Sequence, residues 1–216
     1  MANWCTTFAT IYQNLRIGKP DQRVMLDRVY ATLVAAKRTV GNDLFEIVKA
    51  INGSEVEIPD IGIVNKIELI QSQDKDFWGI QLDIESKWNP PEYFLDALQQ
   101  AITEMPHNDG MEWSTVFLAD EPGSGIFINT DNNHHFYTEV LGIDWNIDDD
   151  KKGGCDHTYF TYKEFDEAAK LIKDCTGVVV TSFEDIAERA DYIREKFEEM
   201  HSDDDSYFFI EPYTCD

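Results

Sequence analysis

The residues whose types and spacing come closest to a metal site lie in the segment 144–150, Asp-Trp-Asn-Ile-Asp-Asp-Asp. Asp144, Asn146 and Asp148 place side-chain oxygens at every second position, as at the start of a calcium-binding loop. The pattern then fails, because Asp149 stands where that loop needs glycine and Cys155 where it needs a bidentate glutamate. We interpret the segment as a solvated acidic loop, with weak calcium binding as the alternative.

A second group of potential ligands combines the segment 131–135, Asp-Asn-Asn-His-His, with the segment 155–157, Cys-Asp-His. These residue types suit zinc and other transition metals, but their spacing matches no known ligand motif. We interpret the histidines as surface loop residues. The alternative hypothesis is a metal-dependent hydrolase that uses His134, His135 and His157 with the acidic segment.

Motifs for other chemistry are missing from the sequence. A serine hydrolase would show a Gly-x-Ser-x-Gly elbow, and the cysteines have no local signature of a nucleophile. Gly123-Ser124-Gly125 lacks the following lysine and the strand-to-helix context of a phosphate-binding loop, so it is predicted to form a turn. We therefore predict no catalytic residues and no cofactor.

The chain has a large excess of acidic over basic side chains, and its carboxylates are the remaining candidate functional groups. The 216 residues include 42 acidic and 18 basic side chains, for a net charge of −24. Acidic and basic residues balance at seven each in residues 1–60, so the whole excess lies further along the chain. Such a surface repels nucleic acid and anionic membranes, whose phosphates need Lys and Arg. It attracts basic proteins instead.

Carboxylates repeated along a rigid element can imitate the charge of a nucleic-acid duplex, and they are densest near the C-terminus. Trp145 and Tyr192 would supply aromatic anchors for such an interface, with Tyr159 and Tyr207 as further examples. A solvated face with incidental charge is the alternative. The predicted partner-binding carboxylates are Asp148, Asp149, Asp150, Glu184, Asp185, Glu188, Asp191, Glu195, Glu198, Glu199, Asp203, Asp204 and Asp205.

The elements that must position these residues follow from periodicity and from Gly and Pro punctuation. For residues 1–131 these signals predict a strand, two helices, a hairpin, a helix that begins after Pro90-Pro91, and a second hairpin. The expected ranges are 3–12, 20–41, 43–51, 67–84 with a turn at 73–76, 92–105, and 112–130 with a turn at 121–124. Apart from the short second helix, this is the ferredoxin-like βαββαβ order with an additional strand.

Three short motifs in this part resemble the Api92-like or YubB-like family of phage and plasmid proteins. They are Met1-Ala2-Asn3-Trp4-Cys5, the segment 85–91 (Glu-Ser-Lys-Trp-Asn-Pro-Pro) and the segment 121–125 (Glu-Pro-Gly-Ser-Gly). The chain departs from the family at Thr7, where members usually carry asparagine, and in its long connection after the first strand. The resemblance implies a ferredoxin-like fold and an origin on a mobile element, and it supplies no catalytic residues.

Residues 132–216 predict a smaller acidic α/β part, either a separate domain or an extension of the first sheet. A strand over 157–162 precedes a helix that Thr161 and Glu164 open as a capping box and Gly177 closes. A short buried strand is expected over 178–181. One long helix, capped by Ser182, then carries apolar residues from Phe183 to Phe197, and a last strand covers 207–210.

Four scattered cysteines, no apolar leader and no membrane-length apolar run predict thiols in a reducing compartment, the cytoplasm of a bacterial host. The sequence therefore predicts an α+β, non-enzymatic, acidic binding protein, a monomer or small homo-oligomer. Its expected partner is a basic host defence protein whose nucleic-acid-binding surface it occupies. The remaining alternatives are the hydrolase and a structural or oligomerisation module whose charge is incidental.

Overall fold

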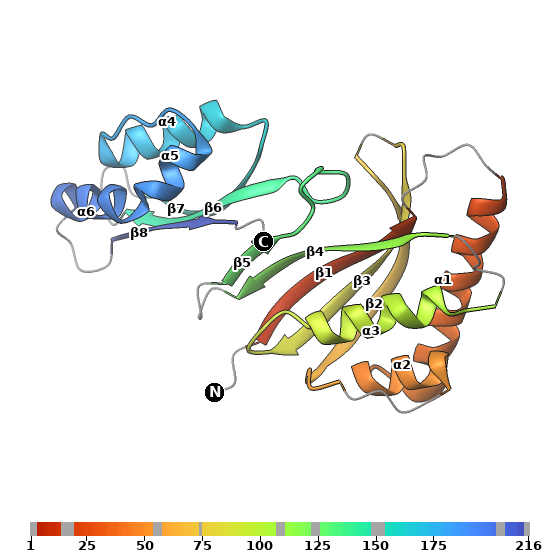
Figure 1. The fold of residues 1–216 in the computed structure, drawn as a ribbon. Helices are drawn as coiled ribbons and strands as arrows, with labels where there is room; N and C mark the ends of the chain where they lie inside the picture. Colours follow the sequence, from red (N-terminus) through yellow and green to blue (C-terminus); the bar gives the residue numbers. More distant parts are fainter. Residues whose placement is uncertain are drawn as a thin grey trace. The chain divides into compact units, whose positions relative to one another are not determined.

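A computed structural model describes residues 4–13, 20–53, 58–73, 75–106, 111–121, 126–147, 154–201 and 206–213. The chain divides into two compact units, Met1–Tyr137 and Thr138–Cys215. Each contains its own antiparallel sheet, five-stranded in the first (sheet A) and three-stranded in the second (sheet B) (Figure 1). The α+β class expected from the sequence is confirmed.

In the N-terminal unit the central strand, β1 (Trp4–Gln13), pairs antiparallel with both β3 (Trp78–Lys87) and β4 (Trp113–Glu121). Ile11 lies opposite Ile80 on one side and opposite Thr115 on the other. The outer strands are β2 (Gly62–Gln71) and β5 (Ile126–Asn129), which gives the order β2-β3-β1-β4-β5. Helices α1 (Pro20–Val40) and α2 (Leu44–Asn52) connect β1 to β2, and α3 (Glu92–Thr103) connects β3 to β4.

Local signals set the ends of these helices. The N–H of Gly41 bonds to Lys37 O at 2.9 Å with φ at 90°, a conformation that glycine adopts without strain, so α1 stops there. Asp43 accepts the Glu46 N–H at 3.1 Å and opens α2. The carboxylate of Asp60 accepts the Phe94 N–H at 2.7 Å in the first turn of α3. The three helices lie where the sequence predicts them.

Alternation along β1 divides the apolar side chains of this unit between two clusters. Ala9 and Ile11 face the helices and join the main core with residues such as Leu33 and Leu98. Phe8 and Tyr12 point to the opposite face, where a second cluster contains Phe77, Val116, Phe136 and Tyr137. Within this unit α1, α2 and α3 cover one face of sheet A (Figure 1), and the segment 131–137 packs on part of the other.

The C-terminal unit has β6 (Glu139–Ile147) at the centre of sheet B, between β7 (Gly154–Thr161) and β8 (Tyr207–Pro212). Helices α4 (Phe165–Thr176), α5 (Phe183–Glu188) and α6 (Ala190–Met200) lie on one side of this sheet (Figure 1). Leu141, Ile143, Phe160, Ile193 and Phe197 are buried between the helices and the sheet. The opposite face of sheet B has no helix of its own unit upon it in the described part of the chain.

Three expectations for this unit were wrong. Residues 144–147 belong to strand β6 and not to a loop, because their apolar members pack against the helices. The segment 178–181 alternates as a strand would, with Val178 and Val180 buried, but it pairs with no described strand. The expected long helix is interrupted at Arg189, whose φ of −111° and ψ of 13° separate α5 from α6.

Among the cysteines whose side chains the structure describes, Cys5 and Cys175 are free and buried thiols. Both were expected to remain thiols. None of the described helices combines the length and the apolar character that crossing a membrane requires.

Candidate functional site

The oxygen ligands predicted in segment 144–150 are split between a strand and residues outside the described part. Asp144 and Asn146 lie on β6, two positions apart, and so share the face of sheet B that points away from the helices. Asp148, Asp149 and Asp150 lie outside the described residues, as do Asp203, Asp204 and Asp205. Among the residues that the structure describes, no three His, Cys, Asp or Glu side chains form a group suited to a metal ion.

The histidine pair and Asp131 have local structural contacts in the N-terminal unit. Asp131 is 1% exposed, and its Oδ2 accepts the N–H groups of Phe136 at 2.6 Å and Tyr137 at 3.0 Å. His134 places Nδ1 3.2 Å from Tyr137 O, and the ring of His135 lies 4.4 Å from that of Phe77. These residues fold the segment 131–137 onto sheet A. His157 belongs to β7 of the other unit, and its side chain lies outside the described part.

The predicted carboxylates of α5 and α6 are exposed except for half-buried Asp185. Asp185 stabilises the start of α5, because its Oδ2 accepts the Thr181 N–H at 2.8 Å. Its pKa is lowered, chiefly by this hydrogen bond. The predicted cap is confirmed, since Ser182 Oγ accepts the Asp185 N–H at 3.1 Å.

Helix cations partly neutralise the α6 carboxylates. Arg194 lies 3.2 Å from Asp191 and 3.9 Å from Glu198, and Lys196 contacts Glu199. Glu188 and Glu195 form no ion pair with a described residue. Exposed pairs of this kind each contribute about 0–1 kcal/mol and are screened by salt. The helix surface is therefore acidic, with mixed charge along α6.

Of the four predicted aromatic anchors, Tyr159, Tyr192 and Tyr207 are exposed and Trp145 packs in the core. Tyr192 is 43% exposed and its ring lies between Arg189, with Cζ at 5.2 Å, and Lys196, with Nζ at 5.7 Å. Trp145 packs against the core under the helices, and its Nε1 is buried with no hydrogen-bond partner in the structure. Tyr192 is thus the predicted anchor that the helix surface presents to a partner.

The sequence indicates Asp144, Tyr159 and Tyr207 but does not place them on one surface. That surface is the opposite face of sheet B, which we call the sheet-B platform. It consists of Asp144, Tyr159, Tyr207, Phe209 and Glu211. Register places Phe209 opposite Asp144, while Tyr159 and Glu211 lie opposite Gly142 from either side. A side chain at Gly142 would meet Glu211 Oε2 at 3.0 Å and Tyr159 Cδ1 at 3.6 Å, so both neighbours lean over this glycine. The signal was available as alternation, since Phe208 and Ile210 face the core.

Sheet A also carries acids on the face away from its helices. Thr6 lies between Glu85 of β3 and Asp120 of β4, and Phe8 lies between Asp83 and Leu118. Burial raises the pKa of Asp83, and Glu85 raises it further, while Lys66 opposes this. The sequence signal is the alternation of Asp83 and Glu85 with buried Leu82 and Ile84.

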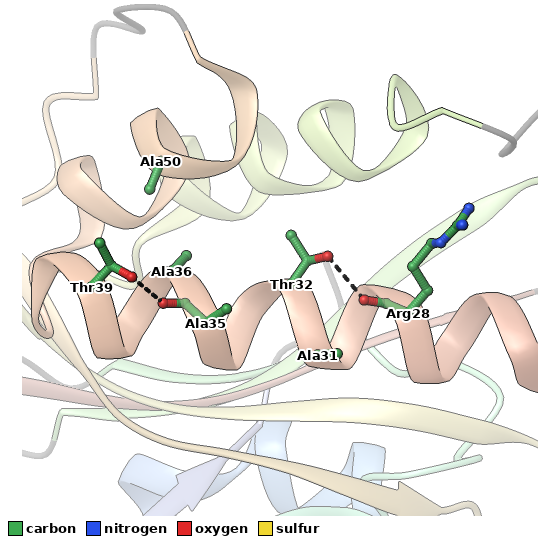
Figure 2. Close-up of a pocket in the computed structure, with 7 residues that line it drawn as sticks. All are labelled: Arg28, Ala31, Thr32, Ala35, Ala36, Thr39 and Ala50. Carbon is green, nitrogen blue, oxygen red and sulfur yellow. Dashed lines mark hydrogen bonds between the residues drawn. The ribbon is translucent and has the colours of Figure 1, made fainter.

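A shallow groove of about 460 Å³ lies along α1, beside Ala50 of α2 (Figure 2). Thr32 Oγ1 donates to Arg28 O at 3.0 Å and Thr39 Oγ1 donates to Ala35 O at 2.8 Å. Because both hydroxyls donate to their own helix, the groove presents mainly methyl groups, and Arg28 is its one charged lining residue. Nothing in this lining suggests catalysis.

No model of a known protein family matches this chain, and a search of curated proteins finds no match.

Proposed function

We propose that this chain is a non-enzymatic, acidic binding protein of a phage or plasmid that occupies the basic, nucleic-acid-binding surface of a host defence protein. The observation that carries the proposal is the set of exposed carboxylates on α5 and α6. They belong to a C-terminal part, residues 138–216, with 22 acidic and eight basic residues and a net charge of −14. The site of action is the host cytoplasm.

The spacing of these carboxylates supports mimicry of a phosphate backbone. Asp191, Glu195 and Glu198 follow one another on α6 at intervals of four and three residues, which places them on one stripe. At about 1.5 Å of rise per residue the stripe advances by roughly 4.5–6 Å between charges. Phosphates of one duplex strand are about 3.4 Å apart along the axis. Arg194 lowers the net charge of the stripe, so its field is weaker than that of a duplex.

The proposed phage or plasmid origin comes with a proposed fold, because the family that the N-terminal motifs resemble is ferredoxin-like. Support comes from the antiparallel order β2-β3-β1-β4, with α1 and α3 as the connections that cross the sheet. β5 then adds a strand beyond β4, and α2 is an additional helix after α1.

The first test is an affinity capture from nuclease-treated bacterial lysate at low salt, with elution by a salt gradient. We expect one stoichiometric basic protein that leaves at a defined salt step, because surface charges are screened within about 8 Å at physiological ionic strength. That protein, once purified, should lose nucleic-acid binding when this chain is added. A diffuse set of basic proteins, or binding insensitive to salt, would contradict the proposal.

Charge variants locate the surface. The variant E188Q/E195Q/E198Q removes three exposed carboxylates from α5 and α6, and E92Q/D96N/E104Q removes three from exposed positions of α3 or its C-terminal end. Both change the net charge from −24 to −21. We expect only the first to weaken competition with nucleic acid, since the second leaves the C-terminal unit intact.

A metal-dependent hydrolase is the second candidate, and one observation favours it. Backbone register places Asp144 opposite His157 and Asn146 opposite Cys155, so residues of ligand type occupy paired positions on β6 and β7. Elemental analysis of protein purified without chelator tests it. Stoichiometric zinc, manganese or calcium that is lost in Asp144→Asn would favour the hydrolase. A metal content below about a tenth of an equivalent per chain would exclude it.

A further inference from the structure

The sheet-B platform presents aromatic rings to solvent. Tyr159 is 45% exposed, Tyr207 38% and Phe209 47%. The rings of Tyr207 and Phe209 stack at 5.4 Å between centroids with an interplanar angle of 30°. Each aromatic side chain buries roughly 150–250 Å² when it is covered, so these rings offer a partner substantial contact area.

The charge around these rings is of one sign. β6, β7 and β8 contain no Lys or Arg, and the platform face carries the carboxylates of Asp144 and of Glu211, which is 8% exposed. Asp156 lies opposite Trp145 and therefore on the helix face of the sheet. The lysines and arginines of the described C-terminal unit lie on the helices, at Arg189 between α5 and α6, or in the turn before α4. The unit therefore separates a face of mixed charge on the helices from an anionic, aromatic face on the sheet.

An aromatic ring face beside a carboxylate favours the binding of a cationic side chain, and arginine fits such a site better than lysine. A guanidinium is planar, stacks on an aromatic ring and pairs with a carboxylate through two parallel hydrogen bonds, whereas an ammonium is a compact, strongly hydrated charge. The chain itself contains the stacked contact, because Arg23 Cζ lies 4.3 Å from the centre of the Trp78 ring. The anionic platform would repel nucleic acid and would also repel the same face of a second copy of this chain.

We propose that the sheet-B platform binds an arginine-bearing segment of the partner protein, with the guanidinium stacked on Phe209 or Tyr207 and paired with Asp144. This inference rests on the proposed function and names the chemistry by which that partner is recognised. The helix carboxylates then supply long-range attraction, and the platform supplies the preference for arginine over lysine.

The test measures binding of two uncharged-capped peptides, (Gly-Arg)4 and (Gly-Lys)4, to the full chain by calorimetry at about 0.15 M salt. The wild-type protein should bind the arginine peptide at least fivefold more tightly, because non-specific attraction to a protein of charge −24 is the same for both. Equal affinity for the two peptides overturns the inference without any variant.

Variants then locate the binding. Tyr207→Thr with Phe209→Thr keeps β-forming residues on β8 and should lower affinity for the arginine peptide about tenfold. Asp144→Asn, nearly isosteric, should remove most of the preference for arginine over lysine. Tyr93→Leu, which removes a ring 65% exposed on the other unit, is the control and should change nothing. Unchanged affinity in both platform variants contradicts the proposal.

The captured host protein separates this inference from the proposed function. If E188Q/E195Q/E198Q weakens its binding and the platform variants do not, the platform inference fails while the proposed function stands. If platform variants weaken it too, both are supported. Self-association that Phe209→Thr abolishes would identify a second copy as the occupant and overturn the inference.

Discussion

The hydroxyl oxygens of Thr10 and Tyr137 lie 2.8 Å apart in the interior of the N-terminal unit, although 127 positions separate the two residues. Thr10 is fully buried on the central strand, and Tyr137 is 6% exposed at the end of the unit. This hydrogen bond fastens the segment 131–137 to the face of sheet A away from the helices. The second apolar cluster thus has a polar contact at its centre.

Tyr137→Phe removes the hydroxyl and leaves Thr10 Oγ1 without this partner. We expect the free energy of unfolding to fall by about 1–2 kcal/mol, the usual cost of a buried hydrogen-bonding group that loses its partner. Urea unfolding followed by tryptophan fluorescence measures it, since four of the five tryptophans belong to this unit. Tyr93→Phe, at a position 65% exposed, is the matched control. Equal stability of the two variants would show that the bond contributes nothing.

A larger effect is expected at Asp131. Its Oδ2 accepts two backbone N–H groups, those of Phe136 and Tyr137. Asp131→Ala leaves both buried and unsatisfied, at about 1–3 kcal/mol each, so the unit should lose roughly 2–6 kcal/mol. Asp131→Asn retains an acceptor oxygen and should lose less.

The control for Asp131 is Asp27→Ala, which breaks an exposed pair with Arg23 at 2.9 Å. Such pairs contribute about 0–1 kcal/mol. Thermal unfolding of the four proteins should rank wild type with Asp27→Ala, then Asp131→Asn, then Asp131→Ala. An Asp131→Ala protein as stable as Asp27→Ala would mean that water satisfies the two N–H groups.

Helix positions in the N-terminal unit were predictable because their signals are local. Gly41 and Gly53 adopt positive φ at helix ends, and the apolar spacing of α1 and α3 is visible in the chain itself. The segment 178–181 shows the limit of that reasoning. Its alternation is correct, with Val179 64% exposed between buried neighbours, but a strand requires a pairing partner, which is a tertiary property.

The sheet-B platform was hidden for a related reason. The sequence predicts an acidic loop at Asp144 and Asn146, so the expected topology lacks the strand β6. Without the central strand, nothing placed Tyr159 of β7 and Phe209 of β8 on one face. Register between strands far apart in sequence decides such a surface, and here it sets Asp144 opposite both His157 and Phe209.

Cys175 should be unreactive in the folded protein. Its side chain is 5% exposed, and burial, assisted by the neighbouring charge of Asp174, raises the pKa of the thiol to about 11. Because the thiolate is the nucleophile, iodoacetamide at pH 8 should modify Cys175 only after unfolding. Peptide mapping distinguishes it from Cys155 and Cys215. Labelling at equal rates in native and unfolded protein would contradict this prediction.

The same pKa has a consequence for stability. A thiol whose pKa is raised on folding contributes stability that is fully present below the unfolded pKa, near 9, and is lost as pH rises toward about 11. The stability difference between wild type and Cys175→Ala should therefore shrink between pH 9 and pH 11. A difference that is constant over this window would argue against a raised pKa.

Asp60 combines a helix-stabilising hydrogen bond with an unfavourable charge, and two substitutions separate them. Burial raises the pKa of this carboxyl, against the hydrogen bonds from the Phe94 and Tyr93 N–H groups that lower it. A raised folded pKa means that the contribution of Asp60 to stability is fully present below the unfolded value of 3.8 and is lost as pH rises through the folded value. Asp60→Asn keeps an acceptor for the Phe94 N–H without the charge, so it should be at least as stable as wild type at pH 7. Asp60→Ala loses the acceptor and should lower the free energy of unfolding by about 1 kcal/mol.

Urea unfolding at pH 7 and at pH 4 measures the stability of both variants. The stability advantage of Asp60→Asn over wild type should be smaller at pH 4 than at pH 7. If Asp60→Asn is as destabilising as Asp60→Ala at pH 7, the carboxylate charge itself stabilises the start of α3, and the assigned cause of the pKa shift is wrong.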